Sequence, residues 1–587
     1  MLESTHISQT IKFNMMCSHK IIVLMVTLVL SSTAGVHGDE HHHSRPLRDS
    51  ATDVNNKAEQ SATEDAAYWT QLGQQLLFDE LAKQRINSQA KNIILFLGDG
   101  MSISTVTAAR IYKGQKAGKT GEEEQLHFDR FPYAALSKTY CTDIQVADSA
   151  CTATAYLCGI KTDVETLGLD VNVIKKNCST QIDPANQVDS VMTWAQAANK
   201  ATGIVTTTRV THATPAGAYA HSANRYWEDD YAQSFDGVDS NTFCDDIAEQ
   251  LVLNSPGKNL KVILGGGRTY LTPTTTTDPE TQEAGRRRDG KNLIYQWVTD
   301  HPTGKYVTTR DELVNLDVAG IDFLLGLFSP SHMEYFLESS AANNPTLEQM
   351  TRAAIQMLQK DANGYVLLVE GGRIDQAHHD GRAKLALEEA FQFDLAVAAA
   401  LNLTNSDDTL IIVTADHSHT LSINGYPKRG NDILGLVGYA ASDLKPYTTL
   451  SYANGPGYAN SFSGGERLDL TDVDTTSDSF LQPAMVPLAT ESHGGDDVAI
   501  FALGPQAHLF QGVYEQHYIA HVMSYAACIG PGFTFCNNPA NPPSTTAIPP
   551  STPSSSSRIG VNRSLGSISA FMSCVWIQRL LVSVFTQ

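Results

Sequence analysis

The sequence has few basic residues for its length. Of its 587 residues, 41 are Lys or Arg and 63 are Asp or Glu, which gives a formal net charge of −22. Nucleic-acid binding needs a dense basic face that releases counterions, so this charge argues against a nucleic-acid partner. It also disfavours anionic ligands, phosphate included, unless the field is reversed locally. Hydrophobic residues make up 42% of the chain, which is enough for a large globular core.

The sequence also lacks an uninterrupted apolar run long enough to cross a bilayer near its N-terminus. Residues 21–30 follow Lys20 and precede small residues. This order is typical of a secretory signal peptide, so we predict that residues 1–38 contain a signal that is removed. A polar segment, residues 39–67, separates this signal from the rest of the chain.

The C-terminus has the order of a lipid-attachment signal. A Pro/Ser/Thr-rich spacer at 537–557 precedes a tail at 558–587, whose apolar part is interrupted by Gln578 and Arg579. A small-residue site, a polar spacer and an apolar tail predict a GPI anchor, with the tail removed. The protein would then contact the membrane through lipid, on the outer face of the plasma membrane. The alternative is a disordered C-terminus.

Cysteine is sparse, with nine residues in the whole chain. Cys17 lies in the predicted leader and Cys574 in the predicted tail, and the remaining odd number implies at least one unpaired thiol. Sequons at Asn177 and Asn402 are compatible with glycosylation on the secretory route. Sequence alone does not fix the disulfide connectivity, but proximity favours Cys141 with Cys151 and Cys528 with Cys536, leaving Cys178 with Cys244 and a free Cys158.

Between residues 68 and 536, short apolar runs alternate with segments of helical period. This pattern predicts an α/β fold with one large, mainly parallel sheet flanked by helices on both faces. Length alone would suggest about four domains. The continuous alternation favours one domain over 68–536 instead.

Four strand-like runs lead into acidic residues and histidines, where turns usually carry Gly, Asn or Ser. The runs are residues 92–97, 203–208, 365–369 and 409–414. Ligands of open α/β sheets lie beyond the carboxyl ends of the strands. A single Asp there is usually a helix cap, but several clusters on one edge indicate a metal site. The residues that follow the runs include Asp99, His212, Thr214, Glu370, Asp375, His379, Asp416, His417 and His419.

The types of side chain narrow the choice of metal. Carboxylate and imidazole without thiolate suit zinc, and an all-oxygen subset suits magnesium. Asp375 and His379 are four residues apart, so they face the same side of one helical turn. Asp416 and His417 need an irregular turn to converge, and His493 offers another imidazole.

Ser149 is the candidate nucleophile. Asp148 or Ser149 caps a predicted helix that runs to Gly159, and the positive helix end and a neighbouring zinc would both favour an alkoxide. The simpler interpretation is that Ser149 is only an N-cap. No G-x-S-x-G motif surrounds it, so no Ser-His-Asp hydrolase is indicated.

In this combination and order, the motifs resemble those of the alkaline phosphatase family, in particular its animal, membrane-anchored, tissue-type branch. The resemblance covers roughly residues 68–536. The stretch at 424–487, rich in Gly, Ser and Asp, corresponds to the family's variable surface insertion. The motifs that carry the resemblance are residues 92–101, Asp148-Ser149-Ala150-Cys151-Thr152 with the residues to 156, and residues 211–217, 370–379 and 414–419.

The resemblance implies two zinc ions and one magnesium ion per chain. One zinc would be held by Asp375, His379 and His493. The second would be held by Asp99, Asp416 and His417, with Ser149 as the attacking group. Magnesium would be held by Asp99, Thr214 and Glu370. Arg225 matches the family's phosphate-binding arginine, and His212 and His419 would orient the metal ligands.

The implied activity is hydrolysis of small phosphate monoesters, with broad specificity and an alkaline optimum, through a phosphoserine at Ser149 in a homodimer. With three ions bound, the site would carry a formal charge of about +2, which suits a phosphomonoester dianion despite the acidic chain.

The sequence departs from the family pattern at several positions. Gln376 stands where vertebrate members often have His, and Cys151 where they have a small residue; we expect neither change to affect the metals. The family also builds a calcium site near Glu280 and Phe328. Here Ser329 and Asn344 stand where acids are usual, so we expect calcium binding to be weak or absent.

Two alternative functions are less consistent with the sequence. A sulfatase or phosphomutase shares the superfamily sheet, but Ser149 lacks the C/S-x-P-x-R context of a sulfatase. An inactive, glycosylated binding protein would have lost ligand residues, whereas all of those named above are present.

Overall fold

The computed structural model describes residues 45–46, 64–238, 244–339, 344–440 and 442–536. The predicted signal peptide, the Pro/Ser/Thr-rich spacer and the predicted GPI tail lie outside these ranges. So does most of the polar segment at 39–67.

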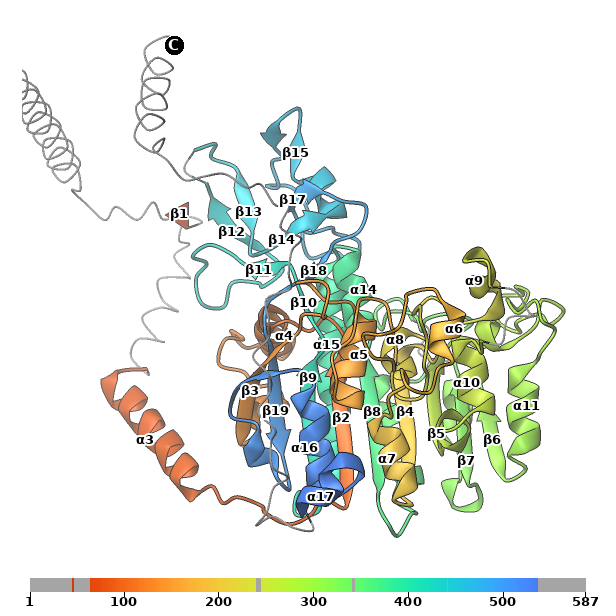
Figure 1. Ribbon diagram of the computed structural model, residues 1–587. Helices are drawn as coiled ribbons and strands as arrows, with labels where there is room; N and C mark the ends of the chain where they lie inside the picture. The colour runs from red at the N-terminus through yellow and green to blue at the C-terminus, as the bar shows by residue number, and fades with distance from the viewer. Residues whose placement is uncertain (1–44, 47–63, 239–243, 340–343, 441, 537–587) are drawn as a thin grey trace, which may run out of the picture. The chain divides into compact units, whose positions relative to one another are not determined.

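A ten-stranded sheet forms the centre of the protein (Figure 1). Only β19 runs antiparallel to its neighbours, β3 and β9, and the other strands run parallel. The predicted fold class is therefore confirmed. In spatial order the strands are β20 (Gly512–Glu515), β3 (Tyr133–Lys138), β19 (Val498–Leu503), β9 (Thr409–Ala415), β2 (Asn92–Gly98), β8 (Tyr365–Gly371), β4 (Ala201–Arg209), β5 (Val262–Gly266), β7 (Phe323–Leu327) and β6 (Gly304–Val307).

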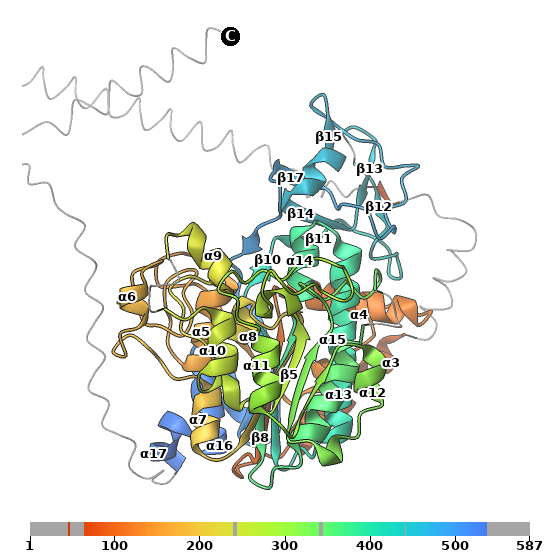
Figure 2. The same cartoon turned by 90° about the vertical axis from the view of Figure 1, so that its right-hand side faces the viewer.

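Helices cover both faces of the sheet, as Figure 2 shows with the sheet seen closer to its edge. Alternate residues of the fully buried strand β2 explain this arrangement, because side chains alternate between the two faces of a strand. Ile93 and Leu95 join one core cluster, and Ile94 and Phe96 join the other. The first cluster packs under α5 (Ser149–Cys158), α7 (Val191–Ala197), α10 (Ile247–Leu253), α11 (Leu293–Asp300) and α16 (Tyr518–Ala527). The second packs under α4 (Ile103–Lys116), α12 (Arg310–Val314), α13 (Leu347–Leu358) and α15 (Ala383–Leu403).

The remaining helices are short, apart from one near the N-terminus. The short helices are α6 (Cys178–Gln181), α8 (Ala213–Ala216), α9 (Asp230–Phe235), α14 (Arg373–His379) and α17 (Phe533–Cys536). The longer one, α3 (Ala66–Ala82), has no buried residue. None of the helices in the described ranges is long and apolar enough to cross a membrane.

The predicted insertion at 424–487 forms small sheets outside the main one (Figure 1). Their strands are β1 (Arg45–Pro46), β11 (Leu421–Ile423), β12 (Leu436–Tyr439), β13 (Pro446–Thr448), β14 (Leu450–Gly455), β15 (Phe462–Ser463), β16 (Glu466–Arg467) and β17 (Ala484–Pro487). A separate two-stranded pair, β10 (Ser418–His419) with β18 (His493–Gly494), flanks the insertion.

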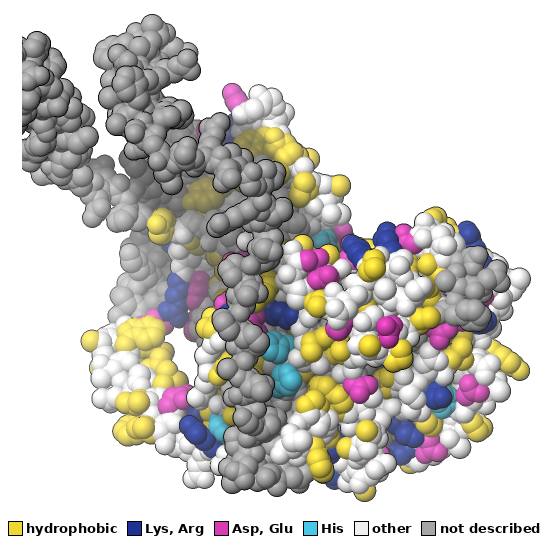
Figure 3. All heavy atoms as spheres, viewed as in Figure 1, with side chains coloured by type: hydrophobic (Ala, Val, Ile, Leu, Met, Phe, Trp, Pro, Cys, Tyr) yellow, Lys and Arg dark blue, Asp and Glu magenta, His cyan; other side chains and the backbone are white. Residues whose placement is uncertain are grey.

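The disulfide pairing favoured by the sequence is confirmed. The structure pairs Cys141 with Cys151, Cys178 with Cys244, and Cys528 with Cys536, and it leaves Cys158 free and buried. On the face drawn in Figure 3, basic and acidic side chains are interspersed.

Candidate active site

The carboxyl ends of four adjacent central strands, β9, β2, β8 and β4, meet at one edge of the sheet, where α5, α8, α14 and the β10–β18 pair also lie (Figure 1). The residues predicted to bind metals come together at this edge. Neighbouring parallel strands end at the same level, so the residues that follow them converge. Three groups of potential metal ligands form there.

The first group contains His419 and the three predicted zinc ligands Asp375, His379 and His493. The Nε2 atom of His493 lies 3.1 Å from Nε2 of His379 and 3.3 Å from Oδ1 of Asp375. His379 Nε2 is also 3.3 Å from the same Asp375 oxygen. As predicted, Asp375 and His379 share one face of a helix, α14. The three ligand atoms therefore form a nearly equilateral triangle.

The second group contains Asp99, Asp416 and His417, all fully buried. His417 Nε2 lies 3.3 Å from Asp416 Oδ2 and 3.5 Å from Asp99 Oδ1. The other Asp416 oxygen, Oδ1, accepts hydrogen bonds of 2.9 Å from the backbone N–H groups of Gly100 and His417. These bonds fix the carboxylate and leave Oδ2 directed at the group.

The third group contains Asp99, Glu370 and His212. Oε2 of Glu370 accepts hydrogen bonds from the hydroxyls of Thr206 and Thr208. Thr214, the predicted third magnesium ligand, is fully buried in α8, and its hydroxyl is 3.5 Å from that of Tyr156. His212, which was expected to orient the metal ligands, thus places a ring nitrogen in this group itself.

Several carboxylate oxygens in these groups are buried without a hydrogen-bond partner among the described residues. They are both oxygens of Asp99, Oε1 of Glu370 and Oδ2 of Asp416. Burial and the carboxylates of Asp375 and Asp416 raise the pKa of Asp99 well above its usual range. Burial likewise raises the pKa of Glu370 to about 7. Such an arrangement is costly unless cations are bound there.

Ser149 begins α5 at the centre of this edge. The predicted helix is confirmed, with Asp148 as its N-cap and Gly159 ending it at φ 79°. Gly159 suits this left-handed position because it has no Cβ. The Ser149 hydroxyl is buried and lies 3.3 Å from Nε2 of His417. The nucleophile candidate therefore contacts the second group of ligands.

Arg225 binds Asp148, the residue before the serine, and is held on two sides. Its Nη1 donates to Asp148 Oδ2 at 2.9 Å, and its Nη2 is 3.2 Å from His212 Nε2. Burial disfavours the ionised form of Asp148, but the charge of Arg225 and the hydrogen bonds from Arg225 and the backbone of Glu165 and Cys151 together outweigh this and lower the pKa of Asp148. Burial, followed by the charges of Arg225 and Arg209, lowers the pKa of His212 to about 3. The guanidinium is thus a cation fixed against the residue that precedes Ser149.

His419 has both ring nitrogens engaged. Its Nε2 lies 2.8 Å from Asp375 Oδ1, and its Nδ1 bonds Glu491 Oε2. Burial disfavours the imidazolium, but these carboxylates raise the pKa of His419 to about 9. With both nitrogens bonded to carboxylates, the ring orients Asp375 and has no free nitrogen to offer an ion.

Two residues that contribute to the site were not assigned a role from the sequence. Glu491 is buried, and its backbone carbonyl accepts from Nδ1 of His379 while its carboxylate holds His419. Its place two residues before His493 was the available signal. His332 packs against His212, with ring centroids 5.3 Å apart, and lies 3.4 Å from the Gln376 amide. It follows β7 in an ordinary loop sequence that gives no such signal.

With this geometry established, the comparisons with known proteins are specific. The family model for alkaline phosphatase matches residues 90–529. The chain belongs to the alkaline phosphatase family. It is 50% identical over 495 residues to the tissue-nonspecific alkaline phosphatase isozyme of Gallus gallus, covering 83% of this chain and 94% of that protein.

A second alkaline phosphatase relative is the membrane-bound enzyme of Bombyx mori. The two are 43% identical over 522 residues, covering 87% of this chain and 94% of that protein. The crystal structure of Thermus thermophilus alkaline phosphatase has the same fold, with a TM-score of 0.54 at 23% identity, covering 75% of this chain and 92% of that one. The chain is therefore an alkaline phosphatase enzyme, the class that hydrolyses phosphate monoesters.

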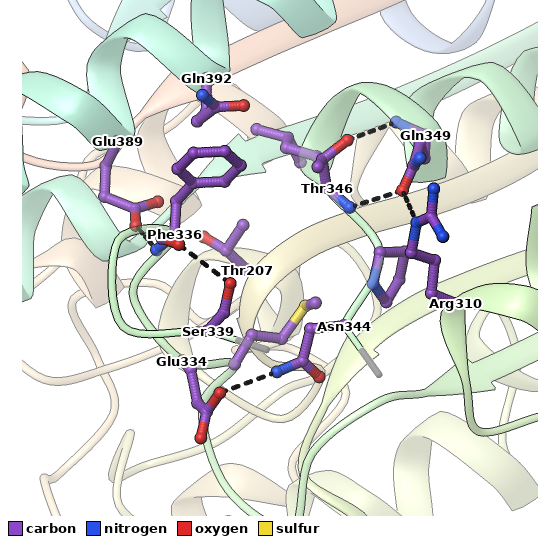
Figure 4. A pocket seen from close by; sticks show the side chains of 13 residues that line it. Thr207, Arg310, Glu334, Phe336, Ser339, Asn344, Thr346, Gln349, Glu389 and Gln392 are labelled. Carbon is purple, nitrogen blue, oxygen red and sulfur yellow. Dashed lines mark hydrogen bonds between the residues drawn. The ribbon is translucent and has the colours of Figure 1, made fainter. Parts of the chain in front are cut away.

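The positions where the family builds a calcium site look different. Glu280 pairs with Nη2 of Arg268 at 2.6 Å, and the Ser329 hydroxyl donates to the His332 carbonyl at 2.7 Å. Asn344 donates to Glu334 at 3.1 Å on the wall of a pocket of about 350 Å³ (Figure 4). Each of these three side chains thus has a protein partner, although Oδ1 of Asn344 is buried without one.

Proposed function

We propose that the protein hydrolyses small phosphate monoesters of broad specificity at alkaline pH, through a phosphoserine formed on Ser149 at a site that holds two zinc ions and one magnesium ion. The observation that carries this proposal is the position of the buried Ser149 hydroxyl. It lies at the positive end of α5, beside His417, whose ring is close to the unpartnered oxygens of Asp99 and Asp416.

The chemistry of the ligand sets supports the choice of metals. Tetrahedral zinc with bonds of about 2.0–2.1 Å separates its ligand atoms by about 3.3 Å. The Asp375, His379 and His493 atoms are 3.1 to 3.3 Å apart. Asp99, Asp416 and His417 would hold the second zinc, and the oxygen ligands Asp99, Thr214 and Glu370 suit magnesium.

These ions would supply Lewis-acid stabilisation of the phosphoryl oxygens and lower the pKa of a bound hydroxyl. The chain's own residues do the rest. Ser149 attacks phosphorus, and the ester oxygen departs in line with it. The planar guanidinium of Arg225, fixed by Asp148, binds two non-bridging phosphate oxygens. Catalysis of this type depends on positioning and charge neutralisation.

The assay that tests the proposal follows hydrolysis of p-nitrophenyl phosphate from neutral to alkaline pH, before and after chelation and again after zinc and magnesium are restored. Activity should vanish on chelation and return with the metals. Ser149→Ala should form no phosphoenzyme. Activity indifferent to chelation would contradict the metal mechanism, and an inactive but fully zinc-loaded protein would favour a binding role.

We also propose that the enzyme is a GPI-anchored, glycosylated homodimer at the cell surface. Asn402 lies on α15 and is exposed, as a glycan acceptor must be. Helix α3 supports a dimer, because it exposes a row of large apolar side chains that a second copy would cover. These are Tyr68, Trp69, Leu72, Leu76, Leu77, Phe78 and Leu81. Release by phosphatidylinositol-specific phospholipase tests the anchor, and ultracentrifugation tests the dimer.

A further inference from the structure

The Cys141–Cys151 disulfide lies unusually close to the reacting groups. It joins the segment after β3 to the first turn of α5 and closes a ten-residue separation that contains Asp148 and Ser149. Both cysteines are buried, at 2% exposure each. The bridge therefore encircles the nucleophile itself, two residues from Ser149.

The segment inside the bridge, residues 142–148, contacts three parts of the site. Asp148 accepts from the backbone N–H groups of Ala150 and Cys151 and so fixes the start of the helix that bears Ser149. The same carboxylate accepts from Arg225 at 2.9 Å. The Ala147 carbonyl accepts from Nδ1 of His493 at 2.7 Å, which directs the other ring nitrogen toward Asp375.

The segment has little other support from regular structure. Residues 142–146 are all exposed and belong to no helix or strand. Thr142 and Asp143 make contacts with the 162–164 loop, but Ile144, Gln145 and Val146 lead into the site as an exposed stretch. A short exposed stretch loses backbone order readily, and a covalent link across it restricts the positions that Ala147 and Asp148 can take.

We propose that the Cys141–Cys151 bridge is a positioning element for catalysis, which holds residues 142–148 so that Ser149, Arg225 and His493 keep their reactive arrangement. Cys141 and Cys151 act through Asp148 and Ala147 and touch no reacting atom. The inference rests on the proposed function, because it assumes the roles given there to Ser149, Arg225 and His493.

The Cys528–Cys536 bridge offers a matched control. It closes a similar span, a separation of eight residues, at the end of α16 and in α17. Because the loops are of similar length, loss of either bridge should relax the unfolded chain by a similar entropy. A difference in catalysis between the two would then come from what each loop holds.

The test compares Cys141→Ser/Cys151→Ser with Cys528→Ser/Cys536→Ser in the full, metal-loaded chain. Removing the first bridge should lower kcat roughly 10-fold, the scale on which loss of an orienting partner affects a metal site. It should also raise the inhibition constant of inorganic phosphate, since Arg225 loses its fixed partner, while the zinc and magnesium content is kept. The control should show unchanged kcat and unchanged phosphate inhibition.

Equal kcat and equal phosphate inhibition in wild type and Cys141→Ser/Cys151→Ser, with only the melting temperature lowered, would overturn the proposal and leave a structural staple. Should the paired variant fail to fold, partial reduction of the native holoenzyme by a phosphine gives the same comparison. Mass spectrometry measures which bridge is open, and activity must then fall with opening of Cys141–Cys151. If Ser149→Ala kept the activity of the wild type, the proposed function itself would be contradicted, before any cysteine is changed.

Discussion

Two regions of the molecule treat buried acidic groups in opposite ways. At the carboxyl edge of the sheet, Asp99, Glu370 and Asp416 keep oxygens without hydrogen-bond partners in the described structure. Around Arg268, the buried carboxylate of Asp278 is paired with the guanidinium, which also binds the exposed Glu280. The first arrangement suits an external cation, whereas the second supplies its own. Unpartnered buried carboxylates therefore mark metal sites better than acidic residues alone.

A further carboxylate shows a third way to accommodate a buried acidic group. Glu389 is buried on the wall of the pocket in Figure 4, where it accepts a hydrogen bond from the Phe336 backbone N–H. Burial raises its pKa to about 7, despite the opposing charge of Arg373. Near neutral pH this group can therefore lose its charge by taking up a proton. Metal, arginine and proton are thus three ways to accommodate a buried acid in one fold.

The sharpest way to break this comparison is to change Asp99, which both the second zinc and the magnesium are proposed to share. Asp99→Asn keeps the shape but removes the charge. We expect activity to fall by at least about 10²-fold, the scale of losing one preorganised electrostatic contact, with less zinc and magnesium per chain by mass spectrometry. Asp278→Asn, which changes the carboxylate paired with Arg268, is the control and should keep both metals. Full metal content in Asp99→Asn would contradict the interpretation of its unpartnered oxygens.

A smaller effect is expected when acidic residues are introduced at Ser329 and Asn344. Wild-type enzyme loaded with zinc and magnesium should not gain thermal stability from calcium. Ser329→Glu/Asn344→Asp introduces acidic side chains at the two positions where the family usually has them and should gain about 2.7 kcal/mol when free calcium is 100-fold above its dissociation constant. Differential scanning calorimetry measures the shift. The neutral variant Ser329→Gln should behave like wild type, and a calcium-dependent rise in wild type itself would show that the site persists.

The sequence was sufficient to predict the central strands, because β2, β8 and β9 are buried on both faces and therefore appear as continuous apolar runs. It was sufficient for α5 as well, since Asp148 and Gly159 are standard end signals of a helix. The convergence of Asp99, Glu370 and Asp416 then follows from parallel neighbours that end at one level.

The parts that could not be predicted depend on pairings between distant segments. β10 pairs with β18 in a register that sets His419 opposite His493, although more than seventy residues separate them. This pairing also brings Glu491 to His379 and His419. His332 reaches Gln376 from a loop after β7. No local pattern encodes contacts of this kind, because the partner segment decides them.

The last expected effect is a change in pH dependence at Glu389, the acid that is accommodated by a proton. The folded-state pKa of Glu389, about 7, lies above its ordinary 4.5, so the protonated group stabilises the fold fully below the ordinary value. That stability is lost as pH rises toward and through 7, by at most roughly 3 kcal/mol. Glu389→Gln cannot ionise, so its stability relative to wild type should rise between about pH 5 and pH 8. The exposed Glu283→Gln serves as control in urea unfolding at both pH values. Parallel changes in wild type and Glu389→Gln would mean that Glu389 finds a cation as Glu280 does, and the distinction between proton and arginine would fail there.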